Sequence, residues 1–134
     1  MTEQTPRQQR VQQMAELVRQ RQQDESAQAQ VLIDEFVRQA EAAGLAPVEL
    51  KATVGGRLVR TNVKGWYLRR DHTIAIGTDG GYYRLGLTGG LAVRLRGVHP
   101  EPSPPPLVVG RGGKDGESGD LSDFLARALA GGVG

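Results

Sequence analysis

The chain has 134 residues, a formal net charge of +2, no cysteine and an aromatic content of only 4%. The lack of cysteine excludes disulfides, thiolate metal sites and cysteine nucleophiles, and no apolar run approaches the roughly 18 residues that a membrane span requires. We therefore expect one domain with a modest aliphatic core and, because the first residues show no basic segment followed by an apolar run, a cytoplasmic location without a secretory signal.

Charge is distributed unevenly along the chain. Residues 51–114 contain eleven Lys or Arg and three Asp or Glu, a local net charge of +8. The flanking residues 1–50 and 115–134 each have a net charge of −3. Four of the six aromatic residues lie in the basic centre: Trp66, Tyr67, Tyr82 and Tyr83. This pattern indicates an anionic partner or an internal pairing of the centre with the acidic flanks.

Residues 1–25 form a glutamine-rich arm, since all eleven glutamines of the chain fall within the first 40 residues. The arm contains good helix formers, but its apolar residues make only a short stripe and the heptad pattern fails at Arg21 and Glu25. The apolar residues are Val11, Met14, Ala15, Leu17 and Val18. Two alternatives stay open: a frayed or disordered solvated arm, or a helix that docks on a partner or self-associates.

A helix over residues 26–43 is the best-defined predicted element. Its apolar residues recur with helical spacing on one broad face. They are Ala29, Leu32, Ile33, Phe36, Val37 and Ala40. Gly44 is suited to the left-handed position after a helix, and Pro47 prevents further helix, so the sequence also predicts where this element ends.

The period changes from helical to alternating after Pro47. Strands are predicted over 48–54, 58–63, 66–70, 73–77, 82–87 and 91–96, with turns at Gly55-Gly56 and over 78–81. The connections are too short for helical crossovers, so we expect an antiparallel meander of five to six strands. Alternation assigns one face to the apolar residues and the other to polar ones. The apolar set is Ile74, Ile76, Tyr83, Leu85, Leu87, Leu91, Val93 and Leu95. The fold class is α+β, with the helix over 26–43 covering the apolar face through Leu32, Ile33, Phe36 and Val37.

The remainder of the chain predicts a crossing segment and a second helix. Residues 99–106 are proline-rich and include Pro102 and Pro105 at Pro-x-x-Pro spacing, which favours an extended polyproline II crossing at the end of a core domain over 26–109. Residues 107–109 predict a short last strand. Within 110–134, a glycine-rich loop precedes a short helix that Asp120 caps, with an apolar stripe. The stripe comprises Leu121, Phe124, Leu125, Ala128 and Leu129.

Motifs for catalysis are incomplete. The loop from Gly110 to Gly116 lacks the Walker spacing, and Ser118 lacks both the closing glycine and the strand of a nucleophile elbow. The acidic residues near 115–123 do not follow the spacing of a calcium loop, and His72 and His99 are not paired as metal ligands. We therefore predict no catalytic, cofactor or metal site.

A basic aromatic sheet face is the remaining candidate site. Lys64-Gly65-Trp66-Tyr67 is similar to the opening of an RNA-recognition strand motif, but Tyr67 replaces a required small residue and the βαββαβ order is absent. The candidate binding residues are Tyr67, Arg69, Tyr82, Arg84, Arg94 and Arg96. The alternative is a solvated arginine face with Trp66 and Tyr83 in the core. We expect a non-catalytic module that binds another protein; nucleic-acid binding is the alternative, and a small enzyme with an unrecognised pocket is a weaker third hypothesis.

Overall fold

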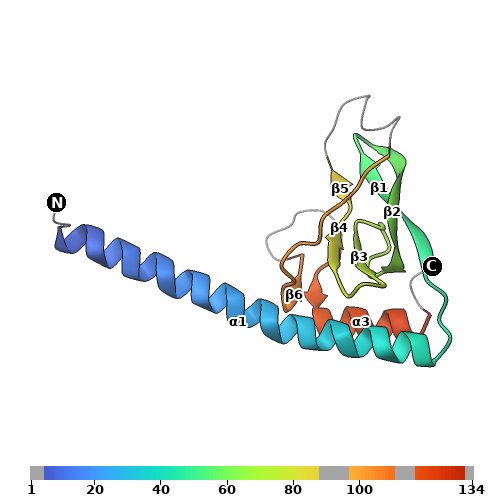
Figure 1. The fold of residues 1–134 in the computed structure, drawn as a ribbon, viewed down its shortest axis with the longest axis horizontal. Coiled ribbons are helices and arrows are strands. Elements are labelled where there is room, and N and C mark those ends of the chain that lie inside the picture. Colours follow the sequence, from blue (N-terminus) through green and yellow to red (C-terminus); the bar gives the residue numbers. More distant parts are fainter. Residues whose placement is uncertain (1–4, 88–96, 111–116, 132–134) are drawn as a thin grey trace.

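The computed structural model describes residues 5–87, 97–110 and 117–131. It consists of a long N-terminal helix, a five-stranded, mostly antiparallel sheet and a short C-terminal helix (Figure 1). The α+β class predicted from the sequence is therefore confirmed. The predicted strand over 91–96 lies outside the described residues.

Helix α1 spans Pro6–Ala42, so the glutamine-rich arm and the predicted 26–43 helix form one continuous helix of 37 residues. At about 1.5 Å per residue, its length is about 55 Å. It begins with a capping box, in which Thr5 and Gln8 each bind the other's backbone N–H through their side chains. It ends as predicted, because Gly44 adopts a φ of 70° and the N–H of Leu45 donates to the carbonyl of Ala40 at 2.9 Å.

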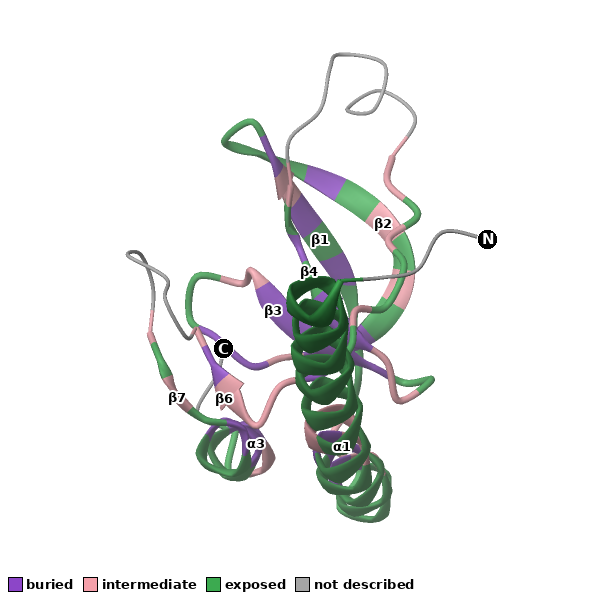
Figure 2. Ribbon diagram, turned by 90° about the vertical axis from the view of Figure 1, so that its left-hand side faces the viewer, coloured by how far each residue is buried: buried purple, intermediate pink, exposed green. Residues whose placement is uncertain are grey.

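Only the C-terminal half of α1 packs on the rest of the protein. Its buried residues are Ala29, Ile33, Phe36 and Ala40, with Val37 half-buried. The prediction that Leu32 belongs to the core is wrong, since its side chain is 37% exposed. Successive residues point about 100° apart around a helix, so Ile33 occupies the centre of the contact and Leu32 its edge. Residues 5–24 are all exposed, as the near turns of α1 show (Figure 2).

The sheet is built from strands β1 (Val48–Val54), β2 (Arg57–Tyr67), β3 (Ile74–Gly77), β4 (Tyr82–Arg84) and β5 (Gly86–Leu87), in the order β4-β3-β2-β1-β5. Gly55 and Gly56 form the predicted turn between β1 and β2, with φ of 56° and 81°. The predicted strands 58–63 and 66–70 are wrong as separate elements, because one strand runs through Arg57–Tyr67.

The sheet closes on itself through the chain segment that contains β4 and β5. Strand β4 pairs with β3, while β5 pairs in parallel with β1 at the opposite edge of the sheet. Leu85, which lies between β4 and β5, bridges both edges: its N–H donates to Thr73 and its carbonyl accepts from Thr53, each at 2.7 Å. The closed sheet has an interior and an outer side, and both carry apolar residues.

Two apolar clusters result from this closure. One lies between the sheet and the helices and includes Phe36 and Trp66, whose rings meet edge to face with centroids 5.5 Å apart. The other fills the interior of the sheet and includes Tyr83 and Leu85. The predicted face that combined Ile74 and Ile76 with Tyr83 and Leu85 is therefore wrong. Ile76 pairs with Tyr82, and in an antiparallel pair a shift of one residue moves every side chain to the other face.

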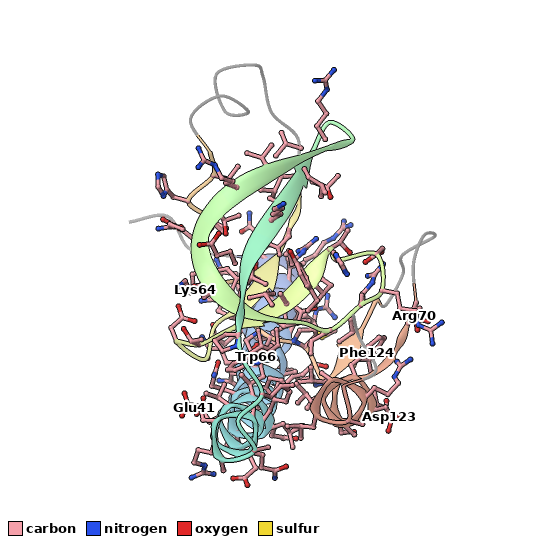
Figure 3. All side chains as sticks on the ribbon, turned by 90° about the vertical axis from the view of Figure 1, so that its right-hand side faces the viewer. Glu41, Lys64, Trp66, Arg70, Asp123 and Phe124 are labelled. Carbon is pink, nitrogen blue, oxygen red and sulfur yellow. The ribbon has the colours of Figure 1, made fainter. Side chains whose placement is uncertain are left out.

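The C-terminal part closes the molecule beside α1. Strands β6 (Val108–Val109) and β7 (Gly119–Asp120) pair antiparallel, and α3 (Leu121–Leu129) packs against α1. The predicted strand at 107–109 and the apolar stripe of the last helix are confirmed, with Leu121, Phe124 and Leu125 buried. Asp120 is the N-cap residue, although its side chain makes no capping hydrogen bond. In Figure 3, Trp66 and Phe124 lie in the region between the sheet and the two helices.

Candidate functional site

The candidate aromatic residues do not form one exposed face. Tyr82 is only 4% exposed and belongs to the cluster under the helices, so the prediction that Tyr82 lies on a binding face is wrong. Tyr67 is half-buried beside the interior cluster, and its hydroxyl oxygen accepts a hydrogen bond from the backbone N–H of Lys51 at 2.8 Å. Arg84 is exposed, whereas Arg94 and Arg96 lie outside the described residues.

Arg69 is buried and holds a loop. Its guanidinium donates to the carboxylate of Asp71 at 2.8 Å, and the other oxygen of that carboxylate accepts from the N–H and hydroxyl of Thr73. Burial raises the pKa of Asp71, but the hydrogen bonds from Thr73 and the charge of Arg69 outweigh it and lower the pKa below its usual value. Arg69 therefore has a structural role, because it holds the loop that contains Asp71 and Thr73.

The Lys64–Tyr67 segment is also explained by packing. Trp66 is buried, and its indole N–H donates to the carbonyl of Leu45 at 3.0 Å. A Cβ at position 65 would lie 1.9 Å from the carbonyl oxygen of Ile76, so glycine is required there by the approach of two strands. The alternative in which Trp66 and Tyr83 are core residues is confirmed.

Tyr83 fixes the β3–β4 turn. Its hydroxyl donates to Asp79 at 2.6 Å, and Asp79 also accepts from the N–H of Gly81 at 2.8 Å. Burial, together with the hydrogen bond to this carboxylate and its negative charge, raises the pKa of Tyr83 to about 12. The neutral hydroxyl of Tyr83 therefore has a structural role, which is to hold the β3–β4 turn.

The exposed half of α1 presents apolar side chains to solvent. Val11 and Met14 are 62% exposed, and Leu17 and Val18 are 48% exposed. We call Val11, Met14, Leu17 and Val18 the arm stripe. The arm stripe is the part of α1 where four large apolar side chains lie within eight residues and are all exposed.

Part of the arm stripe lies on the helix face that is buried farther along, while Met14 and Leu17 are in line with the exposed residues Leu32 and Glu35. Eighteen residues make about five turns of an α-helix, so positions 11, 15, 18 and 22 are in line with 29, 33, 36 and 40. The latter four positions are the buried residues of α1. Val11 and Val18 therefore occupy the same line as Ala29 and Phe36, and the contact face of α1 continues past the edge of the folded body.

A groove lies at the base of the arm. It has a volume of about 710 Å³, between residues 19–30 of α1 and Pro104, Pro105 and Pro106. The N–H of Ser103 donates to the carbonyl of Tyr82 at 2.8 Å, which holds the proline segment along β4. The side chain of Gln30 donates to the carbonyl of Gly80 at 2.8 Å, which ties α1 to the β3–β4 turn. The groove walls are therefore fixed to the folded body.

Arginines lie at both ends of the arm stripe. Helical spacing places Arg7 and Arg10 one turn before Val11 and Met14, and Arg21 one turn after Leu17 and Val18. Arg19 lies on the flank of the stripe and pairs with Glu16 at 3.2 Å. The arm thus combines an apolar stripe with a positively charged border. The apolar and basic residues of the arm are visible in the sequence, but the sequence alone could not decide between a solvated arm and a docking helix.

A second hollow, of about 380 Å³, lies on β1 and β2 and was not predicted. Its lining includes the exposed cations Lys51, Arg60 and Lys64. Lys64 is seen on the outer side of the curved β2 strand (Figure 3). Lys51 is on β1, whereas Arg60 and Lys64 are both on β2, so the proximity of Lys51 to the other two cations depends on the strand register.

The chain matches no family model, and no curated protein or solved structure matches it significantly. In the described part of the chain, no helix combines the length and apolar character needed to cross a bilayer. Among the same residues, no group of three or more His, Cys, Asp or Glu side chains is arranged to hold a metal ion.

Proposed function

We propose that this protein is a non-catalytic module that binds another protein in the cytoplasm, with the partner seated on the arm stripe and in the groove at its base. The observation that carries the proposal is the projection of Val11, Met14, Leu17 and Val18 on a helix that extends beyond the folded body. An amphipathic helix that presents an apolar face to a complementary groove is a common mode of protein recognition.

The free energies of burial and of association indicate that the partner contacts a surface larger than the arm stripe. Complete burial of one aliphatic side chain contributes about 1.5–3 kcal/mol. The four side chains are about half exposed, so covering them contributes about 3–6 kcal/mol. Association costs about 4–15 kcal/mol in lost freedom of motion. The stripe alone does not balance this cost, and the partner must also contact the groove walls near Pro104–Pro106 or the arginines.

Charge defines the chemistry of the partner. Arg7, Arg10 and Arg21 border the stripe, and Lys or Arg beside an apolar contact favour partners that present carboxylates at the matching rim. We therefore expect an apolar groove with an acidic border on the partner. Acidic rims affect mainly the rate of association, so binding should weaken and slow as salt concentration rises.

The proposal is tested by quantitative affinity capture from source-cell lysate treated with nuclease. Three baits are compared: the wild type, Val11→Gln/Val18→Gln, and Leu58→Gln. Leu58 is the control because it is an apolar residue beside the β1–β2 turn that is at least as exposed as the two valines. We expect a partner that is retained by the wild type and Leu58→Gln but lost from the stripe variant. Equal recovery by all three baits, or loss of the partner on nuclease treatment, contradicts the proposal.

A further inference from the structure

The register between β1 and β2 shifts at one point. Glu49 pairs with Lys64, but Lys51 pairs with Arg60, so three residues of β2 face the single residue Leu50 of β1. The hydroxyl of Thr61 donates to the carbonyl of Leu50 at 2.6 Å and accepts from the N–H of Val63 at 3.2 Å. Such bulges bend a strand and redirect its side chains.

The shift brings like charges together. Lys51 and Arg60 are directly opposite across the two strands, where Cβ atoms are about 4.5–5.5 Å apart and like charges are destabilising. Among residues 5–87, 97–110 and 117–131, no ion pair involves Lys51, Arg60 or Lys64. Three cations and one carboxylate, Glu49, line the hollow, which leaves an excess of two positive charges.

A returning segment forms the opposite wall. The N–H of Val98 donates to the carbonyl of Arg60 at 2.9 Å, and Thr61 and Val98 form a parallel bridge. Gly97 has a φ of 86°, and a Cβ there would lie 3.2 Å from the Arg60 carbonyl oxygen. The imidazole-bearing residue His99 completes the lining. The result is a hollow of about 380 Å³, which is large enough for a phosphate group and a small organic substituent.

We propose that this hollow binds the dianionic phosphate of a small phosphate monoester, with Arg60 and Lys51 as its principal ligands. Guanidinium groups bind phosphate oxygens in bidentate fashion, and lysine ammonium groups act as point charges. A dianion balances the two excess positive charges and relieves the repulsion between Lys51 and Arg60. A nucleic-acid phosphodiester carries a single charge per group, and a longer track of cations suits it better.

The test measures the binding of inorganic phosphate and of glycerol 3-phosphate to the full chain. Binding is followed by amide NMR shifts and by the melting temperature, and chloride at matched ionic strength is the control salt. We expect shifts centred on residues 49–64 and 97–99, and a melting temperature that rises with ligand. Lys51→Gln/Arg60→Gln should bind at least about tenfold more weakly, because hydrogen bonds to charged groups are lost. Arg84→Gln is the control, since Arg84 is an exposed arginine outside the hollow.

Three outcomes contradict the proposal. Equal stabilisation of the wild type and the double variant would be a general effect of a kosmotropic salt. Equal weakening by Arg84→Gln would show that net charge, and not the hollow, attracts phosphate. Submicromolar binding of a single-stranded oligonucleotide at physiological salt, lost in the double variant while phosphate alone does not bind, would assign the cations to nucleic acid. Lys51→Gln alone is a second variant, and its exposed position makes a folding defect unexpected.

Discussion

Phe36 should contribute more to stability than any other single side chain of α1. Its ring is almost fully buried and meets the ring of Trp66 edge to face, with Ile33 and Ala40 on the same helix face. Replacement of a buried Phe by Ala costs about 3–5 kcal/mol, and part of that loss is the aromatic pair, worth about 0.5–1.5 kcal/mol. A small domain is stable by about 5–15 kcal/mol, so Phe36→Ala should remove a large share of the total.

Leu32→Ala is the matched control, because Leu32 lies on the same helix at the edge of the contact. Its loss should be roughly 1 kcal/mol, as for a partly exposed aliphatic side chain. The assay is urea unfolding followed by the fluorescence of Trp66, the single tryptophan of the chain. Phe36→Ala should shift the midpoint to much lower urea with an unchanged slope. Equal midpoint shifts in the two variants, or an unchanged midpoint for Phe36→Ala, would refute the packing of α1 described above.

Two further predictions concern the arm and the β3–β4 turn. Deletion of residues 1–24 should leave the free energy of unfolding within about 1 kcal/mol of that of the full chain, because the first buried residue of α1 is Ala29. A truncated protein that does not melt cooperatively would contradict this prediction. Tyr83→Phe should cost roughly 1.5–3 kcal/mol at pH 7, because it removes a 2.6 Å hydrogen bond to a carboxylate. The pKa of Tyr83 is raised to about 12, so the neutral phenol stabilises the fold below about pH 10 and this contribution is lost as the pH rises through 12. The wild type should therefore lose more stability between pH 10 and pH 12 than Tyr83→Phe in thermal melts, and identical pH profiles would show that Asp79 does not hold this hydroxyl.

Features set by neighbouring residues were predictable from the sequence. The end of α1 at Gly44, the turn at Gly55-Gly56 and the apolar stripe of α3 depend on local backbone preferences and helical spacing. The class of fold followed from the same signals, since short connections after a strong helix favour an antiparallel sheet.

Features set by strand register were not predictable in the same way. All four residues of β3 are buried because the sheet closes on itself, so apolar alternation could not assign Tyr82 and Tyr83 to their faces. The hollow lined by Lys51 and Arg60 depends on the register shift opposite Leu50, which no local pattern indicates. The arm required the structure as well, because only the continuity of α1 places Val11 and Val18 in line with the buried Ala29 and Phe36.

The central proposal is that the arm stripe is covered by a partner protein. Its most direct test places a photo-crosslinking residue at Met14, on the stripe, or at Gln12, an exposed residue on the opposite side of the same helix turn, in cells that contain the full chain. We expect adducts with another protein from position 14 and none, or far fewer, from position 12, and loss of the position-14 adduct in a Val18→Gln background. Adducts only with a second copy of the chain would assign the stripe to self-association, and equal adducts from both positions, or none from either, would contradict the account.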